Sequence, residues 1–490
     1  MRPSPVSPLM SLRGWLSAAA LILVLLALAR PLDHDESQYV AAAVLAAHGN
    51  LPYRDFAYLQ VPLQPIVFAP LAWLFGEWAW PGLRVVNALL GTAAIAFVYR
   101  GAREGGAAVR PALLGAGLFA CTDIMLFSIG TARNDALPVA LLAAALPLIM
   151  RAANDRGTRW AALLAGLLLA AAAAAKISYA LPATAYGIYA LLDRRHRPLW
   201  VAVGTLPIMA FVAASASWNP HGFMFGVFEF PAFAPGQYYR DRPWKMSWLA
   251  KLLDTLKFLA LGPALIGLLL TSRVRWRGKW GLARSGRAID WMLWAGILAA
   301  LLPFPTWRQY LLPILPPLFV RLAIGWHVGP PGKRTRIALV VFACAGLAPS
   351  VEALVRAVPG VPMIEAMRQG KAISAAMDAG GVTGPVATLS PQFLPATRRL
   401  PDPRFAAGPF YFRSHDPVAL KIEAVDRLVS RGTLAAHFAR PPAAILIGGE
   451  GKWTSGEAAQ DQALEDWAKR NGWRQMPVEG GRFRLYIKPP

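Results

Sequence analysis

Long apolar segments, separated by short polar loops, recur through the first 350 residues of the chain. Segments of about 15 to 20 apolar residues have the length of a helix that crosses a hydrocarbon core of about 30 Å. The pattern therefore predicts an α-helical polytopic membrane protein with about 11 transmembrane helices. We place these helices at residues 12–29, 83–99, 111–130, 136–150, 160–176, 178–192, 198–216, 249–270, 289–304, 310–328 and 336–350.

One further apolar segment, residues 62–75, does not fit as a membrane crossing. Counting it would reverse the side of every later loop, and three prolines interrupt it. We interpret it as a juxtamembrane or re-entrant helix within a long first outer loop, residues 30–82. Residues 37–48 in the same loop have helix-forming composition and end at a Gly-Asn pair, which is typical of a helix C-terminus.

The basic residues set the orientation of the predicted helices. Lys and Arg are enriched in the cytoplasmic loops of membrane proteins. If the N-terminus lies in the cytoplasm, the basic loops of this chain are cytoplasmic as well. These loops lie at residues 100–110, 151–159, 194–197, 273–287 and 333–336. The first helix is predicted to be retained, because no small-x-small cleavage site follows it. An odd number of crossings then places the C-terminus outside.

From about residue 351 the charge rises and the long apolar runs cease. Helix-like stretches at 361–379, 417–433 and 456–471 alternate with strand-like ones at 385–389, 443–447 and 483–488. The sequence thus predicts two domains: a transmembrane domain of residues 1–350 and a small α/β extracytoplasmic domain of residues 351–490. The Gly-Gly-Glu-Gly run after the second predicted strand lacks the helix that a dinucleotide site needs.

Composition supports the membrane class and narrows the partners. The chain is 56% hydrophobic and 16% charged, with a mean hydropathy of +0.40. The formal charge of +23 does not indicate nucleic-acid binding, because the basic residues lie in short loops and form no continuous face. The two cysteines both fall within apolar runs, so neither a disulfide framework nor a thiolate metal site is predicted.

The candidate chemistry begins directly after the first helix. Asp33, His34, Asp35 and Glu36 follow one another at the mouth of the membrane, where ionisable residues are costly and usually functional. The predicted topology puts other polar residues on the same outer side: Arg54, Asp55, Arg133, Asp135, Lys176, Tyr179, Arg240, Arg308 and Tyr310, with Asp123 deeper in the third helix. Carboxylates beside separate cations suit a reaction that deprotonates a nucleophile and stabilises an anionic leaving group.

These loops resemble the GT-C superfamily of polyprenyl-phosphate-sugar-dependent glycosyltransferases, in particular its bacterial, glycosyltransferase family 39-like branch. Protein O-mannosyltransferases and lipid A aminoarabinose transferase are relatives in that superfamily. The resemblance extends over residues 10–350 and includes the general layout of an outer C-terminal domain. It rests on Asp35-Glu36-Ser37-Gln38-Tyr39, on residues 49–56, on Ala132 to Ala136, on Lys176 and on Arg308 to Pro316.

The resemblance implies a role for each of these residues. Asp35 would be the catalytic base, Glu36 would orient the site, and Asp135 would lie near the acceptor or a metal. Lys176 and Arg308, together with Arg133 or Arg240, would hold the lipid phosphate, for which guanidinium forks are well suited. Arg54, Tyr179 and Tyr310 are further candidates for substrate binding.

The resemblance also implies an enzyme of the bacterial inner membrane that transfers a sugar, with inversion, from a polyprenyl-phosphate donor to a lipid, glycan or protein hydroxyl. The acids together with His34 or His221 could gather a divalent ion, but no ligand spacing demands one. The sugar and the acceptor are not specified by the sequence.

Each of these residues also has a structural interpretation. The acids at 33–36 could cap the next helix, and Arg133 and Asp135 could form a structural ion pair. Arg54 could pair with Asp55, and Lys176 could extend to the lipid headgroups. At the level of the whole protein, the alternatives are a transporter or lipid flippase, and a non-catalytic subunit of an envelope polysaccharide assembly system.

Overall fold

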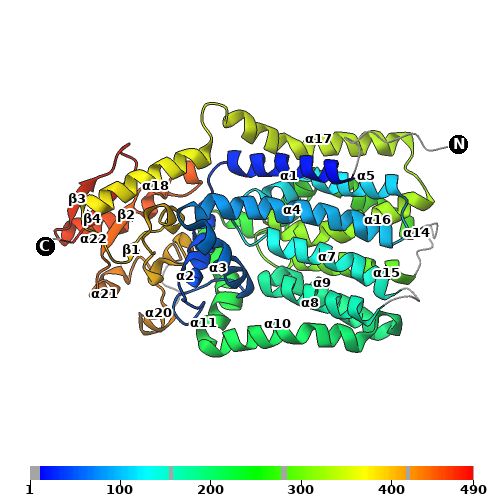
Figure 1. Ribbon diagram of the computed structural model, residues 1–490, viewed down its shortest axis with the longest axis horizontal. Coiled ribbons are helices and arrows are strands. Elements are labelled where there is room, and N and C mark those ends of the chain that lie inside the picture. The colour runs from blue at the N-terminus through cyan, green and yellow to red at the C-terminus, as the bar shows by residue number, and fades with distance from the viewer. Residues whose placement is uncertain (1–11, 154–157, 277–283, 415–419, 489–490) are drawn as a thin grey trace.

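The computed structural model describes residues 12–153, 158–276, 284–414 and 420–488. A bundle of long helices forms one part of the molecule, and the C-terminal α/β region covers one end of that bundle (Figure 1). The short helices α2 (Glu36–Ala47) and α3 (Leu63–Phe75) lie between the two parts (Figure 1). The helix predicted at 62–75 is therefore present, and it lies at the bundle end beside the C-terminal region.

Most of the predicted long helices are present with shifted ends. Within the described residues, five helical segments are long and apolar enough to cross a membrane, or up to seven if each of two bent pairs is one crossing. The predicted number of eleven crossings is therefore not confirmed. The bundle helices are α1 (Leu12–Ala29), α4 (Ala79–Glu104), α7 (Ala136–Ala152), α8 (Arg159–Ala175), α9 (Ala180–Leu192), α10 (Pro198–Trp218), α15 (Arg284–Leu301), α16 (Leu315–Val328) and α17 (Lys333–Arg356).

The bundle has a central helix and a lipid-facing periphery. In the apolar window that contains α16, 89% of the residues are buried, whereas the corresponding share is 22% in α1 and α17 and 17% in α10. The outward residues of α1 are large and apolar, such as Leu21 and Ile22. Apolar side chains on the outside are expected where the surrounding medium is hydrocarbon rather than water.

Two of the predicted helices are wrong because each is broken near its middle. Residues 111–130 form α5 (Val109–Ala120) and α6 (Asp123–Ile129), bent by 65°, and residues 249–270 form α13 (Trp248–Ala260) and α14 (Ala264–Trp276), bent by 103°. The second break precedes Pro263, which disfavours helical geometry in the residue before it.

The two breaks face each other and satisfy part of each other's backbone. The Asp123 amide donates to the Leu261 carbonyl at 2.9 Å. Gly262 adopts a φ of +141°, and a Cβ there would lie 2.8 Å from the Thr122 Cα. A buried backbone break needs internal partners in a membrane bundle. Hydrophobic periodicity does not predict these two breaks or their pairing, because the side chains before and after each break remain apolar.

The remaining helices and strands surround the bundle end. The link from α10 to α13 contains α11 (Pro220–Met224) and α12 (Phe230–Tyr238). The C-terminal region contains α18 (Pro362–Ala379), α19 (Pro409–Phe412), α20 (Leu420–Asp426), α21 (Leu434–His437) and α22 (Gln462–Arg470), together with β1 (Val386–Ala387), β2 (Ala444–Ile447), β3 (Arg474–Pro477) and β4 (Arg484–Ile487).

The sheet has the strand order β1-β2-β4-β3. β1 pairs in parallel with β2, whereas β4 is antiparallel to both β2 and β3. The three predicted strands are present, and β3 was missed because its side chains are mostly exposed and show no apolar alternation. The helix predicted at 417–433 is shorter, and its first residues, like residues 277–283 of the predicted inner loop at 273–287, lie outside the described residues. The domain boundary at residue 350 stays a prediction, since α17 continues to Arg356.

The crossing of α8 and α10 gives a direct test of the bundle. A Cβ at Gly204 of α10 would lie 2.0 Å from the Leu163 carbonyl oxygen, and one at Gly166 of α8 would lie 2.1 Å from that of Val201. Small residues allow such close backbone approach between membrane helices. We expect Gly204→Ala to destabilise the purified protein by about 1–3 kcal/mol, measured by unfolding in detergent. Gly187→Ala is the matched control, because a Cβ there meets nothing within 4 Å, and an equal effect of both changes would contradict the crossing.

Candidate active site

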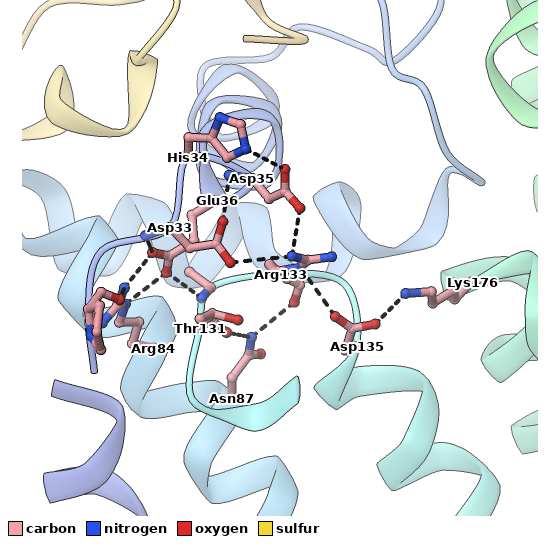
Figure 2. Close-up of polar contacts among 12 residues, drawn as sticks. Asp33, His34, Asp35, Glu36, Arg84, Asn87, Thr131, Arg133, Asp135 and Lys176 are labelled. Atoms are coloured by element: carbon pink, nitrogen blue, oxygen red, sulfur yellow. Dashed lines mark hydrogen bonds and ion pairs between the residues drawn. The ribbon is translucent and has the colours of Figure 1, made fainter. Parts of the chain in front are cut away.

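Four loops at the end of the bundle bring the predicted polar residues together. They are the α1–α2 link with residues 30–35, the α6–α7 link with residues 130–135, the α8–α9 turn at Lys176, and the segment that starts at Arg308. Figure 2 shows acids of the first loop facing Arg133 of the second, with Asp135 and Lys176 beside it. Asn87 of α4 fixes the second loop by donating to the carbonyls of Thr131 and Arg133 at 2.6 and 3.0 Å.

Asp35 is the most exposed carboxylate of this cluster. Its side chain is 23% exposed, against 16% for Asp33 and none for Glu36 and Asp135. One carboxylate oxygen accepts from Arg133 Nη1 at 2.7 Å, and the other lies 3.3 Å from His34 Nε2. Burial opposes the charge on Asp35, but Arg133, His34, Arg413 and Lys176 outweigh it and hold the pKa below its usual range. The carboxylate is therefore ionised at neutral pH.

Both carboxylate oxygens of Asp33 make contacts within the site, and one of them stabilises the loop. Its Oδ1 accepts from the Asp35 amide at 2.9 Å, and its Oδ2 lies 3.3 Å from Arg133 Nη1. Burial and the nearby Asp35 charge raise the pKa of Asp33. When two neighbouring carboxylates share one guanidinium, their pKa values move apart, because the guanidinium cannot stabilise both negative charges equally. Asp35 thus takes the larger share of the negative charge.

Glu36 is held in a fully buried ion pair with Arg84 of α4. Arg84 donates to it from Nε at 2.8 Å and from Nη2 at 2.5 Å, and the Ala132 amide donates at 2.6 Å. Arg84 also donates to the carbonyls of Ala27 and Arg30, which end α1. Both side chains have no exposed surface, so this pair holds the α1–α2 and α6–α7 links together, and the orienting role of Glu36 stays a prediction. Sequence reasoning missed Arg84, although a lone arginine inside an apolar helix is a signal for a buried partner.

Asp135 connects the cations of the site. It is fully buried, lies 3.4 Å from Arg133 Nε and pairs with the Lys176 ammonium. The Lys176 Nζ lies 5.9 Å from the centre of the Tyr310 ring. The hydroxyl of buried Tyr179 has no hydrogen-bond partner among the described residues. The sequence prediction that Asp135, Lys176, Tyr179 and Tyr310 belong to one neighbourhood fits this geometry, while their roles stay predictions.

The break between α5 and α6 brings Asp123 to Arg308. Arg308 Nη1 donates to Asp123 at 2.8 Å, and its guanidinium lies 3.6 Å over the Phe127 ring. The guanidinium groups of Arg133 and Arg30 lie 5.5 and 5.6 Å from the same ring. A ring face attracts cations, so Phe127 holds several like charges close together without a carboxylate for each.

Two predicted binding residues lie apart from this cluster. Arg54 pairs with neighbouring Asp55 at 2.7 Å and is half exposed, so this pair braces the first outer loop, as one of the two interpretations expected. Arg240 is exposed, and no ion pair of Arg240 is found in the described parts of the chain. His221 pairs with Asp426 at 2.7 Å and therefore links α11 to the C-terminal region.

Sequence reasoning missed the contribution of the C-terminal region. The Glu450 carboxylate lies 3.2 Å from His34 Nδ1 and accepts a hydrogen bond from it when that nitrogen is protonated, and Arg413 interacts electrostatically with Asp35. Gly408 touches the start of α2, where a Cβ would lie 2.2 Å from Ser37 Oγ. No local motif marks these residues, because their partners are several hundred positions away in the sequence.

Across the described residues, Asp33, His34 and Asp35 form the one group of possible metal ligands whose atoms lie within 4.8 Å of one another. The oxygen-rich set suits a hard divalent cation. The Arg133 guanidinium contacts both carboxylates, so it already supplies a positive charge at the position that an ion would share.

Comparison with known proteins supports the expected class. Residues 60–218 match a family described as dolichyl-phosphate-mannose-protein mannosyltransferase, and no curated protein sequence matches the chain. ArnT from Cupriavidus metallidurans bound to undecaprenyl phosphate has 15% identity and a TM-score of 0.62, with 98% of this chain and 100% of that chain covered.

A second similar structure is the Archaeoglobus fulgidus oligosaccharyltransferase tethered with an acceptor peptide. It has 13% identity and a TM-score of 0.52, with 91% of this chain and 72% of that chain covered. The structural likenesses show that this chain shares the fold of these two proteins, and the family match over residues 60–218 supports the predicted class of membrane glycosyltransferase. The roles assigned to individual residues stay predictions.

The buried pair gives a stability prediction. Removing one partner of a buried ion pair leaves the other charge uncompensated, at a cost of about 3–5 kcal/mol, so Glu36→Gln should lower the free energy of unfolding by about that amount. The control is Glu104→Gln, which breaks the exposed pair with Arg151 and should cost about 0–1 kcal/mol. Denaturant titration of the purified proteins measures both, and similar small losses would show that the Glu36–Arg84 pair is not formed.

The pair of His34 and Glu450 gives a pH prediction. Burial opposes protonation of His34, but the hydrogen bond to Glu450 and the charges of Asp35 and Glu450 outweigh it and raise the pKa. A raised pKa contributes stability that is complete below the unfolded value of about 6.5 and is lost as pH rises through the folded value.

The wild type should therefore lose thermal stability as pH rises from about 6.5 through the raised pKa of His34. The Glu450→Gln variant should lose less over the same interval. The measurement is the apparent melting temperature from pH 5.5 to 9, in steps of half a unit. Parallel curves for the two proteins would contradict a protonated His34 in the folded state.

Proposed function

We propose that this membrane glycosyltransferase of the GT-C superfamily transfers one sugar from a polyprenyl-phosphate donor to an acceptor hydroxyl. The reaction would take place on the extracytoplasmic face of the bacterial inner membrane, at the bundle end that the C-terminal region covers. One observation carries the proposal: the exposed carboxylate of Asp35 lies beside Arg133, in a cluster that also holds Lys176 and Asp135. A base and an anion-stabilising group are therefore adjacent.

The proposed step has two partners on opposite sides of the anomeric carbon. The acceptor oxygen forms a bond to that carbon and gives its proton to Asp35, while the bond from the carbon to the phosphate oxygen breaks. The electron pair leaves with the phosphate, so the lipid phosphate is released as an anion and the configuration inverts. General-base help of this kind contributes a factor of about 10² to 10⁴ in rate.

The cations would stabilise the leaving phosphate. Lys176 and Arg133 are fixed by Asp135, and Arg308 is fixed by Asp123. Fixed charges that face a developing negative charge lower the barrier because they need no reorganisation during the reaction. Asp135 would then act by orienting two cations, in place of the acceptor contact that the resemblance implied.

The comparisons support the donor class without naming the sugar. The matched family is described by a dolichyl-phosphate-linked mannose, and the ArnT structure was determined with undecaprenyl phosphate. Both ligands carry a single phosphate on a polyprenyl chain. A single phosphate can be neutralised by the Arg and Lys side chains of this site, which are strong, directional phosphate ligands.

The base gives the central test. With a radiolabelled polyprenyl-phosphate sugar and a panel of lipid, glycan and hydroxyl-peptide acceptors, the purified wild type should show acceptor-dependent transfer. Asp35→Asn should lose a factor of about 10² to 10⁴ in kcat while expression and folding stay normal. Asp241→Asn is the matched control, since Asp241 is exposed, and should retain wild-type rates. Transfer by Asp35→Asn at the wild-type rate would exclude Asp35 as the base.

A further inference from the structure

We propose that Arg413 of the C-terminal region binds the phosphate of the lipid-linked substrate, so that this region supplies part of the substrate site. The inference rests on the proposed function and adds a residue to it. Arg413 directly follows α19, and no sequence motif pointed to it. It is a half-buried arginine whose charge interacts with that of Asp35.

Two aromatic rings hold the Arg413 side chain. Its guanidinium lies 3.9 Å over the Tyr238 ring and 5.5 Å from the centre of the Phe410 ring. The Tyr238 hydroxyl donates to the Phe410 carbonyl at 2.6 Å and thereby joins α12 to the segment that carries Arg413. A guanidinium stacked on a ring keeps the edge of its planar fork open for hydrogen bonds.

The charge of Arg413 lacks the compensation that the other cations of the site have. Arg133, Lys176 and Arg308 each pair with a carboxylate. Arg413 has no carboxylate within 4.0 Å in the described ranges, and its buried Nε has no hydrogen-bond partner there. Burial opposes the charge on Arg413, but Tyr238, Asp35 and Glu450 raise its pKa, so the side chain is protonated. A half-buried guanidinium without a carboxylate partner is well suited to bind an incoming phosphate.

Two contacts hold the region that carries Arg413 against the loop of Asp35. Gly408, five residues earlier, packs against Ser37 at the start of α2, and Glu450 pairs with His34. The neighbours of Asp35 in the sequence are thus held by the same region that carries Arg413. The anion that meets Arg413 would therefore also meet the reacting centre, which in the proposed function is where the donor phosphate lies.

The test is direct binding, because it needs neither the sugar nor the acceptor. The wild type, Arg413→Ala, Arg413→Lys and the control Arg440→Ala, whose side chain is exposed, are each titrated with a short-chain polyprenyl phosphate by thermophoresis in detergent. The matching polyprenol and inorganic phosphate are the second and third ligands. The affinity of Arg413→Ala for polyprenyl phosphate should fall about 10- to 100-fold, with partial recovery in Arg413→Lys and no change in Arg440→Ala.

The ligands separate the possible outcomes. Polyprenol should bind the wild type and Arg413→Ala alike, and inorganic phosphate should lose affinity in parallel with polyprenyl phosphate if Arg413 contacts the phosphate. A parallel loss for polyprenol would mean that the change displaces the region, which overturns the proposal. Unchanged binding of polyprenyl phosphate by Arg413→Ala, or a loss confined to inorganic phosphate, also overturns it. If the wild type binds no polyprenyl phosphate, the proposed function itself fails.

Discussion

The buried ion pair between Glu36 and Arg84 is the interaction on which the site depends. It joins the carbonyls at the end of α1, the middle of the bundle through α4, and the amide of Ala132 in the α6–α7 link. Asp35 is the residue before Glu36, and Arg133 is the residue after Ala132. One buried contact therefore fixes the backbone on both sides of the Asp35–Arg133 pair. Such a pair contributes little net stability but enforces one arrangement, since breaking it leaves a buried charge.

A second constraint is that nearly every charge of the cluster is already balanced. Arg133 alone contacts three carboxylates, those of Asp33, Asp35 and Asp135. This sharing keeps Asp35 ionised and at the same time leaves its exposed side open. The repulsion among neighbouring cations is reduced further by Phe127, whose ring faces the guanidinium groups of Arg308, Arg133 and Arg30. An incoming phosphate would therefore enter a site whose positive groups are held in place before it arrives.

The sequence predicted the parts of the fold that depend on the length of the apolar runs. It also predicted the parts of the site that depend on which side of the membrane each loop lies. The long helices follow from hydrophobic runs, and Asp35, Arg133, Asp135 and Lys176 came together because their loops were assigned to one side. The breaks at Thr122 and Gly262 were not predicted, since a bend within an apolar run changes no side-chain pattern and depends on the other break as its partner. Arg84 was missed for a related reason: burial of an arginine is decided by a glutamate 48 positions away.

The contacts of the C-terminal region could not be predicted from the sequence either, because they also join distant parts of the chain. These contacts explain why the site needs this region. In the bundle alone, His34 would face water on one side and Asp35 would have Arg133 as its main cation. The docked region adds Glu450 against His34 and Arg413 beyond Asp35, and its contact at Gly408 tolerates no side chain next to Ser37. The carboxylate of Asp35, the guanidinium of Arg133 that pairs with it and the guanidinium of Arg413 thus come from separate parts of the chain. Because a charge placed between them is desolvated on several sides, each interaction in the site is stronger than it would be in water, and the proposed transfer of a sugar from a phosphate to a hydroxyl would depend on that condition.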